Sequence, residues 1–433
     1  MDMYGIIEKK RDGGKLSKEE IRYWIEGIVA GRIPDYQTSA LLMAIFLRGM
    51  DREETYALTE CMMYSGDIAD LSDIPGIKVD KHSTGGVGDK TTLVVAPVAA
   101  AAGVPVAKMS GRGLGFTGGT IDKLEAIPGF RTKLTMEEFK RLVRENGIAV
   151  MGQTADIAKA DKILYALRDV TATIENISLI ASSIMSKKLA SGSNAIVLDV
   201  KCGDGAFMHS AENAVRLAEL LVAMGKSAGR RTAAVISNMD TPLGRAVGNS
   251  LEVAEAVEVL RGDGPDDIHE ICLELSGLMI FLGEKAETAE EGREKAEELI
   301  ESGAALEKFR QFISAQGGDP EITERSEKMG EAEDAADVTA VSSGVITSLP
   351  AEMVGYASQH AGAGRAVKDS EIDLNAGIVL RRKPGDAVKK GEVLATVYGK
   401  TEKAGIAAEY LKHAYEIGDN AVPAKPVVLK KVF

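Results

Sequence analysis

Residues 80–92 read DKHSTGGVGDKTT, and residues 108–120 read KMSGRGLGFTGGT. The first segment leads from a β-prone run at 77–79 into a helix, and the second directly follows a β-prone run at 104–109. Glycines let the backbone turn sharply and bring its N–H groups close to a ligand. A helix N-terminus adds free donors and partial positive charge, so such a junction suits phosphate. The two segments therefore predict an α/β sheet that binds an anion at its strand ends.

Further along the chain, short β-prone runs alternate with helical patterns. The runs lie at 91–102, 148–151, 195–200 and 233–237. A capping box at Thr135 and Glu138 opens one of the intervening helices, and another is expected around 211–224. Because strands separated by helices favour parallel pairing, we predict a mostly parallel sheet. The α/β domain is expected to comprise residues 70–158 and 193–330.

The first 66 residues show only helical patterns. Ser17 with Glu20 forms a capping box, and Asp51 with Glu54 caps a later helix. Two further helical patterns, at 161–168 and 178–190, interrupt the strand–helix alternation. We expect them to pack with the N-terminal helices, which gives a helical domain made of residues 1–66 plus about 160–192.

Residues 321–337 are acidic and poor in large apolar groups, which is typical of a domain junction. After it the chain becomes β-rich, and residues 383–395 (KPGDAVKKGEVLA) are typical of a hairpin edge in biotinyl- or lipoyl-like folds. No lysine stands at a hairpin tip in the setting that those folds modify, so a structural end domain is expected over 338–433. The predicted fold class is α/β, with a small all-helical domain, a large mostly parallel α/β domain and a C-terminal β-rich α+β domain.

The amino-acid composition and net charge argue against some classes of partner. The chain of 433 residues has a net charge of −13 and no dense basic patch, so nucleic acid is not an expected partner. No apolar run reaches the roughly 18 residues of a membrane span, and the N-terminus lacks the apolar core of a signal peptide. Three unclustered cysteines indicate reduced thiols in the cytoplasm. Closely spaced cations between 81 and 112, on an otherwise acidic protein, indicate a small anion as ligand.

Two nucleotide-binding motifs compete with the phosphate interpretation. Gly113, Gly115 and Gly118 fit GxGxxG, but the acid that should follow about 20 residues later is missing. The run that ends at 89–91 is similar to a Walker A loop, yet Thr84 and Asp89 occupy its two glycine positions. A purely structural role for the loops explains the glycines, but it leaves the hydroxyls and lysines unexplained.

Four blocks resemble the pyrimidine and thymidine phosphorylase family, in the family's order and at its spacing. They are KHSTGGVGD (81–89), KMSGRGLGFTGGTIDKLEAIPGF (108–130), YALRDVTATIENISLIASSIMSKKLA (165–190) and DVKCGDGAF (199–207). The similarity extends over essentially the whole chain. It implies a homodimer in which a cleft between the helical and α/β domains closes on substrate. It also implies phosphorolysis, with inorganic phosphate as co-substrate and no organic cofactor.

The resemblance assigns residues to the two substrates. The phosphate residues it implies are Lys81, Ser83, Lys108, Ser110 and Thr120, with Thr92 nearby. The base is assigned to Arg168, Ser183 and Lys187, where the two cations would stabilise negative charge on the departing pyrimidine. His82 would hydrogen-bond a base carbonyl or donate a proton, or else serve only as a structural histidine. Lys188 is expected only to complement the helix dipole.

Two positions depart from the family pattern. Phe116 stands where the family often has histidine, which puts a proton role at that position in doubt. Lys90 stands where some members have a threonine in a monovalent cation (potassium) site, whose other members would be Gly88, Leu243, Ala246 and Glu255. We predict that the Lys90 ammonium pairs with Glu255 and replaces the cation. The alternative is that Lys90 points to solvent and the cation site is intact or absent.

The sequence thus predicts a pyrimidine-nucleoside phosphorylase that acts on uridine, thymidine and deoxyuridine in pyrimidine salvage, yielding free base and pentose 1-phosphate. A strict thymidine phosphorylase or a nucleoside-monophosphate phosphorylase is the alternative, and a non-catalytic nucleoside- or phosphate-binding protein is the third possibility. Lys108-Met109-Ser110 favours the broad enzyme, because strict bacterial thymidine enzymes tend to lack that lysine. The set at 168, 183 and 187 argues against a non-catalytic protein.

Overall fold

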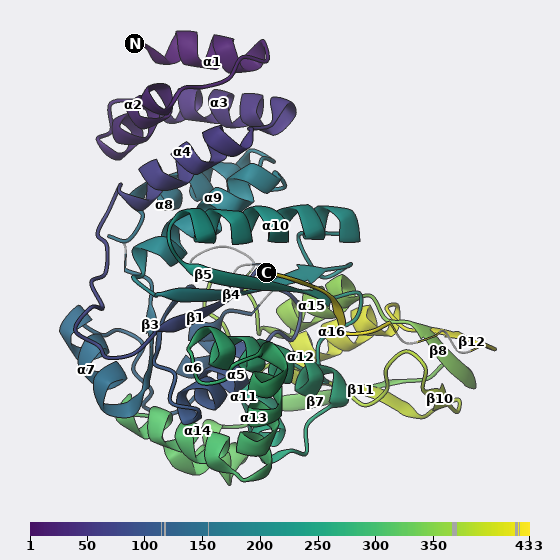
Figure 1. The fold of residues 1–433 in the computed structure, drawn as a ribbon. Coiled ribbons are helices and arrows are strands. Elements are labelled where there is room, and N and C mark those ends of the chain that lie inside the picture. Colours follow the sequence, from purple (N-terminus) through teal and green to yellow (C-terminus); the bar gives the residue numbers. More distant parts are fainter. Residues whose placement is uncertain (114, 117, 155, 366–369, 421–422, 424) are drawn as a thin grey trace.

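The chain begins with a layer of helices, shown at the top of Figure 1. In a computed structural model, the described residues are 1–433 except 114, 117, 155, 366–369, 421–422 and 424. The helices of this helical part are α1 (Met3–Arg11), α2 (Lys18–Val29), α3 (Asp35–Arg48), α4 (Arg52–Met63), α8 (Lys159–Val170) and α9 (Ile177–Ala190). Both expected capping boxes are present at α2 and α4. As predicted, α8 packs on α2 and α3, and α9 packs on α4.

The α/β part is built on a sheet of order β1-β4-β5-β13. Its strands are β1 (Val79–Ser83), β4 (Ala195–Cys202), β5 (Arg231–Asn238) and β13 (Val428–Val432). The first three pair in parallel, with Lys81 opposite Val197 and Ser83 opposite Asp199. A separate parallel pair joins β2 (Val106–Ser110) to β3 (Ile148–Gly152). The predicted, mostly parallel α/β architecture is therefore confirmed.

Helices cover both faces of this sheet. Figure 1 shows α10 (Ala211–Ser227) above β4 and β5, while α12 (Asp266–Leu282) and α5 (Thr91–Ala101) lie below. The other helices are α6 (Thr120–Glu125), α7 (Met136–Asn146), α11 (Asn249–Arg261), α13 (Ala289–Glu301) and α14 (Ala304–Ala315). Each face has its own apolar core, and the core below the sheet is the larger one.

The expectation of a β-prone run at 91–102 is wrong, because these residues form helix α5. Every residue from Thr91 to Ala100 is buried, so the helix has no polar face. An apolar run without such a face carries no helical periodicity and is hard to distinguish from a buried strand.

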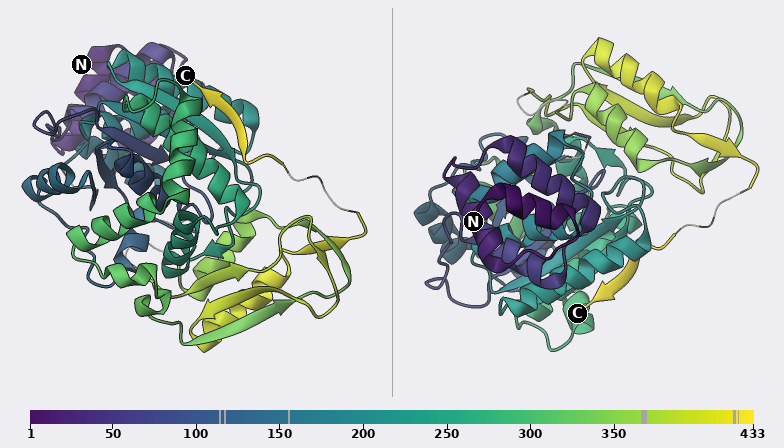
Figure 2. Two further views of the ribbon diagram at one scale, coloured as in Figure 1. Left: turned by 60° about the horizontal axis from the view of Figure 1, so that its bottom comes forward. Right: turned by 90° about the horizontal axis from the view of Figure 1, so that it is seen from above.

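The C-terminal part lies beside the α/β part (Figure 2). Its elements are β7 (Asp334–Thr339), β8 (Gly344–Ser348), α15 (Ala351–Ala361), β9 (Gly377–Leu380), β10 (Ala387–Val388), β11 (Val393–Gly399), α16 (Thr401–Lys412) and β12 (Glu416–Gly418). Strands are exchanged across the boundary. The short β6 (Ala246–Val247) pairs with β9, and β13 pairs antiparallel with β5. Residues 428–432, at the end of the predicted C-terminal domain, therefore extend the sheet of the α/β part, since strand pairing follows edges that the fold leaves free and not proximity in sequence.

Candidate functional site

The carboxyl ends of β1 and β2 bring the two glycine-rich segments together. Ser83 ends β1 and Ser110 ends β2, with Lys81 and Lys108 two residues before them in the same strands. The Lys108 ammonium donates to the main-chain carbonyl of Lys81. Sequence analysis expected these four side chains at neighbouring strand ends, and this is their position.

Buried carboxylates surround Lys81. Its Nζ donates to the Thr91 hydroxyl and lies 3.6 Å from Asp199 Oδ2 and 4.0 Å from Asp89 Oδ1. Burial acts to raise the pKa of Asp89, but the charges of Lys81, Lys201 and Lys123 together hold it well below its usual range. Asp89 is therefore ionised, and it fixes the Lys81 ammonium at the strand end.

Lys108 is the cation whose charge is most readily changed. Burial, together with the neighbouring charges of Lys188 and Lys81, lowers its pKa to about 7, although Asp80 at 3.6 Å acts in the opposite direction. The group is thus divided between ammonium and amine near neutral pH. An arriving anion would favour the ammonium.

Three hydroxyls at this edge are available to a ligand. Thr92 lies in the first turn of α5, Thr120 begins α6 and Ser110 ends β2. Among the residues that the structure describes, their hydroxyls make no hydrogen bond. Ser83 differs, because its hydroxyl already accepts from the Gly85 N–H at 3.2 Å. Residues 114 and 117 of the second glycine-rich segment lie outside the described residues.

The expectation for Lys188 is wrong. This residue is buried, and its Nζ donates to Asp80 Oδ2 at 2.7 Å and to the Met109 carbonyl at 3.2 Å. It therefore joins the end of α9 to both β1 and β2 instead of complementing a dipole. Sequence reasoning missed Lys188 and Asp80, because an ion pair between residues 108 positions apart leaves no local pattern.

The expected base-binding residues come from α8 and α9. The Lys187 ammonium donates to the Ser183 hydroxyl at 3.1 Å and to the Asp161 carboxylate, so Ser183 and Lys187 share one helical face as predicted. Arg168 is buried, and burial lowers its pKa to about 10. Its guanidinium donates to the carbonyls of Thr173, Leu179 and Ile174. Asp161 was not anticipated, although it lies seven residues before Arg168 on the same helix.

His82, in β1, is influenced by lysines from both groups of residues. Burial and then the charges of Lys188, Lys108, Lys187 and Lys81 lower the pKa of His82 well below 6.5. The imidazole is therefore neutral near pH 7, with one N–H to donate. A neutral donor among several cations suits the binding of one anion and the stabilisation of a second, developing negative charge.

Phe116, the first departure, faces the C-terminal part. Its ring lies 4.9 Å from the ring of Tyr356 on α15. An atom added at Gly355 Cα would meet this ring at 2.7 Å, so the two segments approach closely. The position has no group that could carry a proton.

Lys90, the second departure, is buried with its ammonium among oxygens. Its Nζ donates to the carbonyls of Leu243 and Ala246, both at 2.9 Å, and to Glu255 Oε2. The Lys90 backbone N–H donates to the Gly88 carbonyl at 3.0 Å. The expected contact between Lys90 and Glu255 is thus present, and these oxygens do not fit a further cation while the ammonium binds them. Among the described residues, no group of three histidine, cysteine or acidic side chains is arranged to hold a metal.

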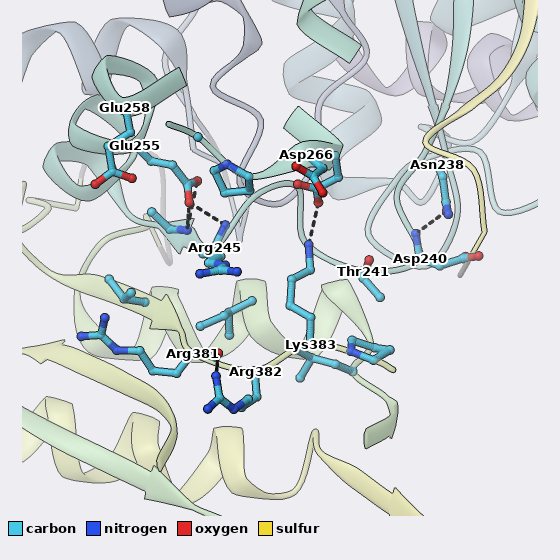
Figure 3. Close-up of a pocket in the computed structure, with 18 of the residues that line it drawn as sticks. Asn238, Asp240, Thr241, Arg245, Glu255, Glu258, Asp266, Arg381, Arg382 and Lys383 are labelled. Carbon is cyan, nitrogen blue, oxygen red and sulfur yellow. Dashed lines mark hydrogen bonds and ion pairs between the residues drawn. The ribbon is translucent and has the colours of Figure 1, made fainter. Parts of the chain in front are cut away.

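A cavity of about 990 Å³ lies between the α/β part and the C-terminal part (Figure 3). Arg245 reaches it from the α/β part, and Arg381, Arg382 and Lys383 reach it from the C-terminal part. The described residues that line it include none of the expected phosphate or base residues, although Ala246 and Glu255 of the Lys90 site line one side. Both acidic and basic side chains line it, so charge of one sign does not dominate the cavity.

Known proteins match the chain along its length. The glycosyl transferase helical bundle domain matches residues 4–66, the glycosyl transferase a/b domain matches 76–306, and the pyrimidine nucleoside phosphorylase C-terminal domain matches 345–418. The anthranilate phosphoribosyltransferase of Thermus thermophilus covers 73% of this chain and 99% of its own, with a TM-score of 0.59 and 21% identity, which shows a shared fold. In the described residues, no helix has the length and apolarity needed to cross a membrane.

Two relatives match throughout. The pyrimidine-nucleoside phosphorylase of Geobacillus stearothermophilus is 54% identical over 432 residues, which is 100% of both chains. The pyrimidine-nucleoside phosphorylase of Staphylococcus haemolyticus is also 54% identical, over 100% of this chain and 99% of its own. Identity of this extent covers the helical part, the α/β part and the C-terminal part alike. The chain is an enzyme that belongs to the pyrimidine-nucleoside phosphorylase family.

Proposed function

We propose that this enzyme cleaves pyrimidine nucleosides with inorganic phosphate, releasing free base and pentose 1-phosphate in pyrimidine salvage. Uridine, thymidine and deoxyuridine are the proposed substrates. The observation that carries the proposal is that lysines from β1, β2 and α9 (Lys81, Lys108 and Lys187) all lie near enough to His82 to lower its pKa. A phosphate at the first two lysines and a base at the third would therefore both lie near His82.

Phosphate is proposed to bind at the strand ends. The residues are Lys81, Ser83, Thr92, Lys108, Ser110 and Thr120. Two buried ammonium groups offset the charge of the anion, and the hydroxyls that have no hydrogen bond to another described residue supply donors. The held phosphate then attacks the anomeric carbon as the nucleophile, so no covalent enzyme intermediate is needed. Positioning supplies much of the rate.

The base is proposed to bind at α8 and α9. As the glycosidic bond breaks, its electron pair passes to the pyrimidine, whose carbonyl oxygens gain negative charge. Lys187, oriented by Asp161 and Ser183, would stabilise this charge where it develops. Arg168 would do so through the N–H donors that its three carbonyl contacts leave over. His82, with its lowered pKa, fits a neutral hydrogen-bond donor to a base carbonyl better than an imidazolium acid.

The Lys90 ammonium is proposed to serve in place of a monovalent cation. Three oxygens accept hydrogen bonds from it, and an ammonium has three N–H donors. The contact ties the first glycine-rich segment to Glu255 on α11. The enzyme would then need neither potassium nor an organic cofactor.

The proposed assembly is a cytoplasmic homodimer. Tyr4 of α1 is 70% exposed, and Tyr36 and Leu47 of α3 are 74% and 72% exposed. Because α1 packs on α3, these apolar side chains belong to one exposed layer of helices. Exposed apolar groups on neighbouring helices favour burial against a second copy. The three cysteines are unpaired, which is consistent with a reducing compartment.

Release of free base from uridine, thymidine and cytidine, with and without inorganic phosphate, tests the proposal. Uridine and thymidine should both react, and only with phosphate present. Reaction of thymidine alone would identify the strict enzyme. Base release that proceeds equally well without phosphate would show hydrolysis and contradict the proposed function.

A further inference from the structure

Arg365 of the C-terminal part forms a paired contact with the second glycine-rich segment. Its Nη1 donates to Asp122 Oδ2 at 2.9 Å, and its Nη2 donates to Asp122 Oδ1 at 2.8 Å. The same Nη1 also donates to the Gly113 carbonyl at 3.2 Å. The Asp122 side chain is 2% exposed and that of Arg365 is 12% exposed. A bidentate pair that is this buried holds both partners in one geometry.

Asp122 in turn contacts the second glycine-rich segment at two neighbouring residues. Its Oδ2 accepts the Gly113 N–H at 2.7 Å, and its Oδ1 accepts from Arg112 Nη1 at 3.0 Å. One carboxylate on α6 therefore ties Arg112 and Gly113, in the middle of the segment, to the helix that follows it. Burial acts to raise the pKa of Asp122, but Arg365, the Gly113 N–H and Arg112 lower it below its usual value, so the carboxylate is charged.

This charge lies two residues from Thr120, one of the proposed phosphate ligands. A carboxylate there opposes the binding of a phosphate dianion unless a cation offsets it. Arg112 is a weak candidate for that cation, since its side chain is 44% exposed and also pairs with Glu125. Arg365 is the less exposed of the two cations, and Asp122 is its only carboxylate partner among the described residues.

The backbone near Arg365 also adjoins the segment. Arg365 and Gly115 form an antiparallel bridge. A Cβ at Gly364 would lie only 2.8 Å from the Gly115 carbonyl oxygen. The contact between Phe116 and Tyr356 adds a third approach. Residues of the C-terminal part therefore contact the second glycine-rich segment at Gly115 and Phe116.

We propose that Arg365 is a positioning residue for phosphate: it neutralises Asp122 and holds the second glycine-rich segment in the form that presents Ser110 and Thr120. The inference rests on the proposed function, and it gives the C-terminal part a role in the reaction. Arg365 itself touches neither phosphate nor base. It acts through Asp122.

The test measures steady-state kinetics of Arg365→Met with phosphate and with nucleoside as the varied substrate. The KM for phosphate should rise about 10-fold or more, because the buried Asp122 carboxylate then keeps only the 44% exposed Arg112 side chain as a cation partner. The kcat and the KM for nucleoside should change less than about 3-fold, since base binding is untouched. Arg381→Met is the matched control, because Arg381 is exposed, has no ion pair with a described residue and belongs to the same C-terminal part. It should leave all three constants unchanged.

A second variant separates the effect of the Asp122 charge from the effect of its hydrogen bond to Gly113. Asp122→Asn added to Arg365→Met removes the carboxylate charge that Arg112 alone offsets, and it keeps an acceptor for the Gly113 N–H. The KM for phosphate should therefore return most of the way to the wild-type value. Arg365→Lys, which keeps the charge and loses the bidentate geometry, should give an intermediate KM. The same ranking is expected in the rise of melting temperature that inorganic phosphate causes.

Unchanged KM for phosphate in folded Arg365→Met would overturn the inference. So would an equal loss in kcat and in both KM values that Asp122→Asn does not repair, since that pattern belongs to a general packing contact. If Arg365→Met does not fold, Arg365→Lys and the double variant decide between these outcomes. Failure of the proposed function is distinct, because it would appear in the wild-type enzyme as base release without phosphate.

Discussion

Lys90 and Lys383 bind the same five-residue segment, 242–246. Their carbonyl acceptors interleave along it: Leu243 and Ala246 for Lys90, Pro242 and Gly244 for Lys383. Each ammonium also has a carboxylate partner, Glu255 for Lys90 and Asp267 for Lys383. Since Lys90 belongs to the first glycine-rich segment and Lys383 to the C-terminal part, residues 242–246 connect the two. With Arg365, the C-terminal part thus contacts the surroundings of both glycine-rich segments.

Replacing Lys90 should create a requirement for potassium. In Lys90→Thr the carbonyls of Leu243 and Ala246 and the Glu255 carboxylate lose their cation, and a potassium ion can take its place. Activity and melting temperature of this variant should fall when potassium is exchanged for a bulky organic cation at constant ionic strength. The wild-type enzyme should change little in the same exchange. Wild-type activity that is lost on potassium removal and regained on its return would contradict the role of the ammonium.

Lys81→Ala should affect phosphate more than nucleoside. Removing the ammonium leaves Asp89 and Asp199 without their nearest shared cation and takes away one proposed phosphate contact. The apparent KM for phosphate should rise about 10-fold or more, and that for uridine much less. Initial rates over a grid of both substrates check this. Equal effects on both substrates would argue against a phosphate site at Lys81.

Lys187→Ala should lower turnover. Each charge-assisted hydrogen bond contributes roughly 1.5–3 kcal/mol, so a loss of about 10- to 100-fold in kcat is expected. Lys162→Ala, at an exposed position of α8, is the control and should keep full activity. If folded Lys187→Ala retains near-normal turnover, the base is held elsewhere.

Anion binding should weaken as pH rises through about 7. Lys108 has a pKa lowered from 10.5 to about 7, so its ammonium is present below that pH and is lost above it. Sulfate, which does not titrate in this range, is the suitable probe, because phosphate changes its own charge. The inhibition constant of sulfate should increase between about pH 6 and about pH 8, on either side of the lowered pKa. Burial is the largest cause of this lowered pKa, and the charged groups that act on the amine are Asp80, Lys188 and Lys81.

Lys108→Arg is the matched variant for this pH dependence. A guanidinium stays charged throughout the range, so the inhibition constant of sulfate should become nearly independent of pH. A slope that survives in Lys108→Arg would assign the titration to another group.

The exposed apolar layer of α1 and α3 should mediate dimerisation. Leu47→Asp introduces a charge at a side chain that is 72% exposed in the single chain, and it should shift the enzyme toward monomer in sedimentation velocity. Val341→Asp, at a 61% exposed site of the C-terminal part, should leave the mass unchanged. A wild-type monomer at micromolar concentration would contradict the proposed homodimer.

Much of the architecture follows from the sequence alone. The capping boxes at Ser17 and Asp51 and the shared face of Ser183 and Lys187 involve residues three or four positions apart, and a helix brings such residues together wherever it lies. The strand–glycine–helix order likewise places Lys81 and Lys108 at strand ends. The helix α5 was not predicted correctly, because its burial on all sides removes the periodicity that marks a helix.

Only the tertiary structure decided which buried charges meet. Lys188 pairs with Asp80, and Arg365 with Asp122, across 108 and 243 positions of the chain. The pairing of β13 with β5 is equally remote in sequence. The physical reason is that a buried charge needs a partner close in space, and local spacing carries no record of which distant residue supplies it. The residue types of the site could therefore be read from the sequence, while the charges that orient them and adjust their pKa values are set by the packing of distant segments.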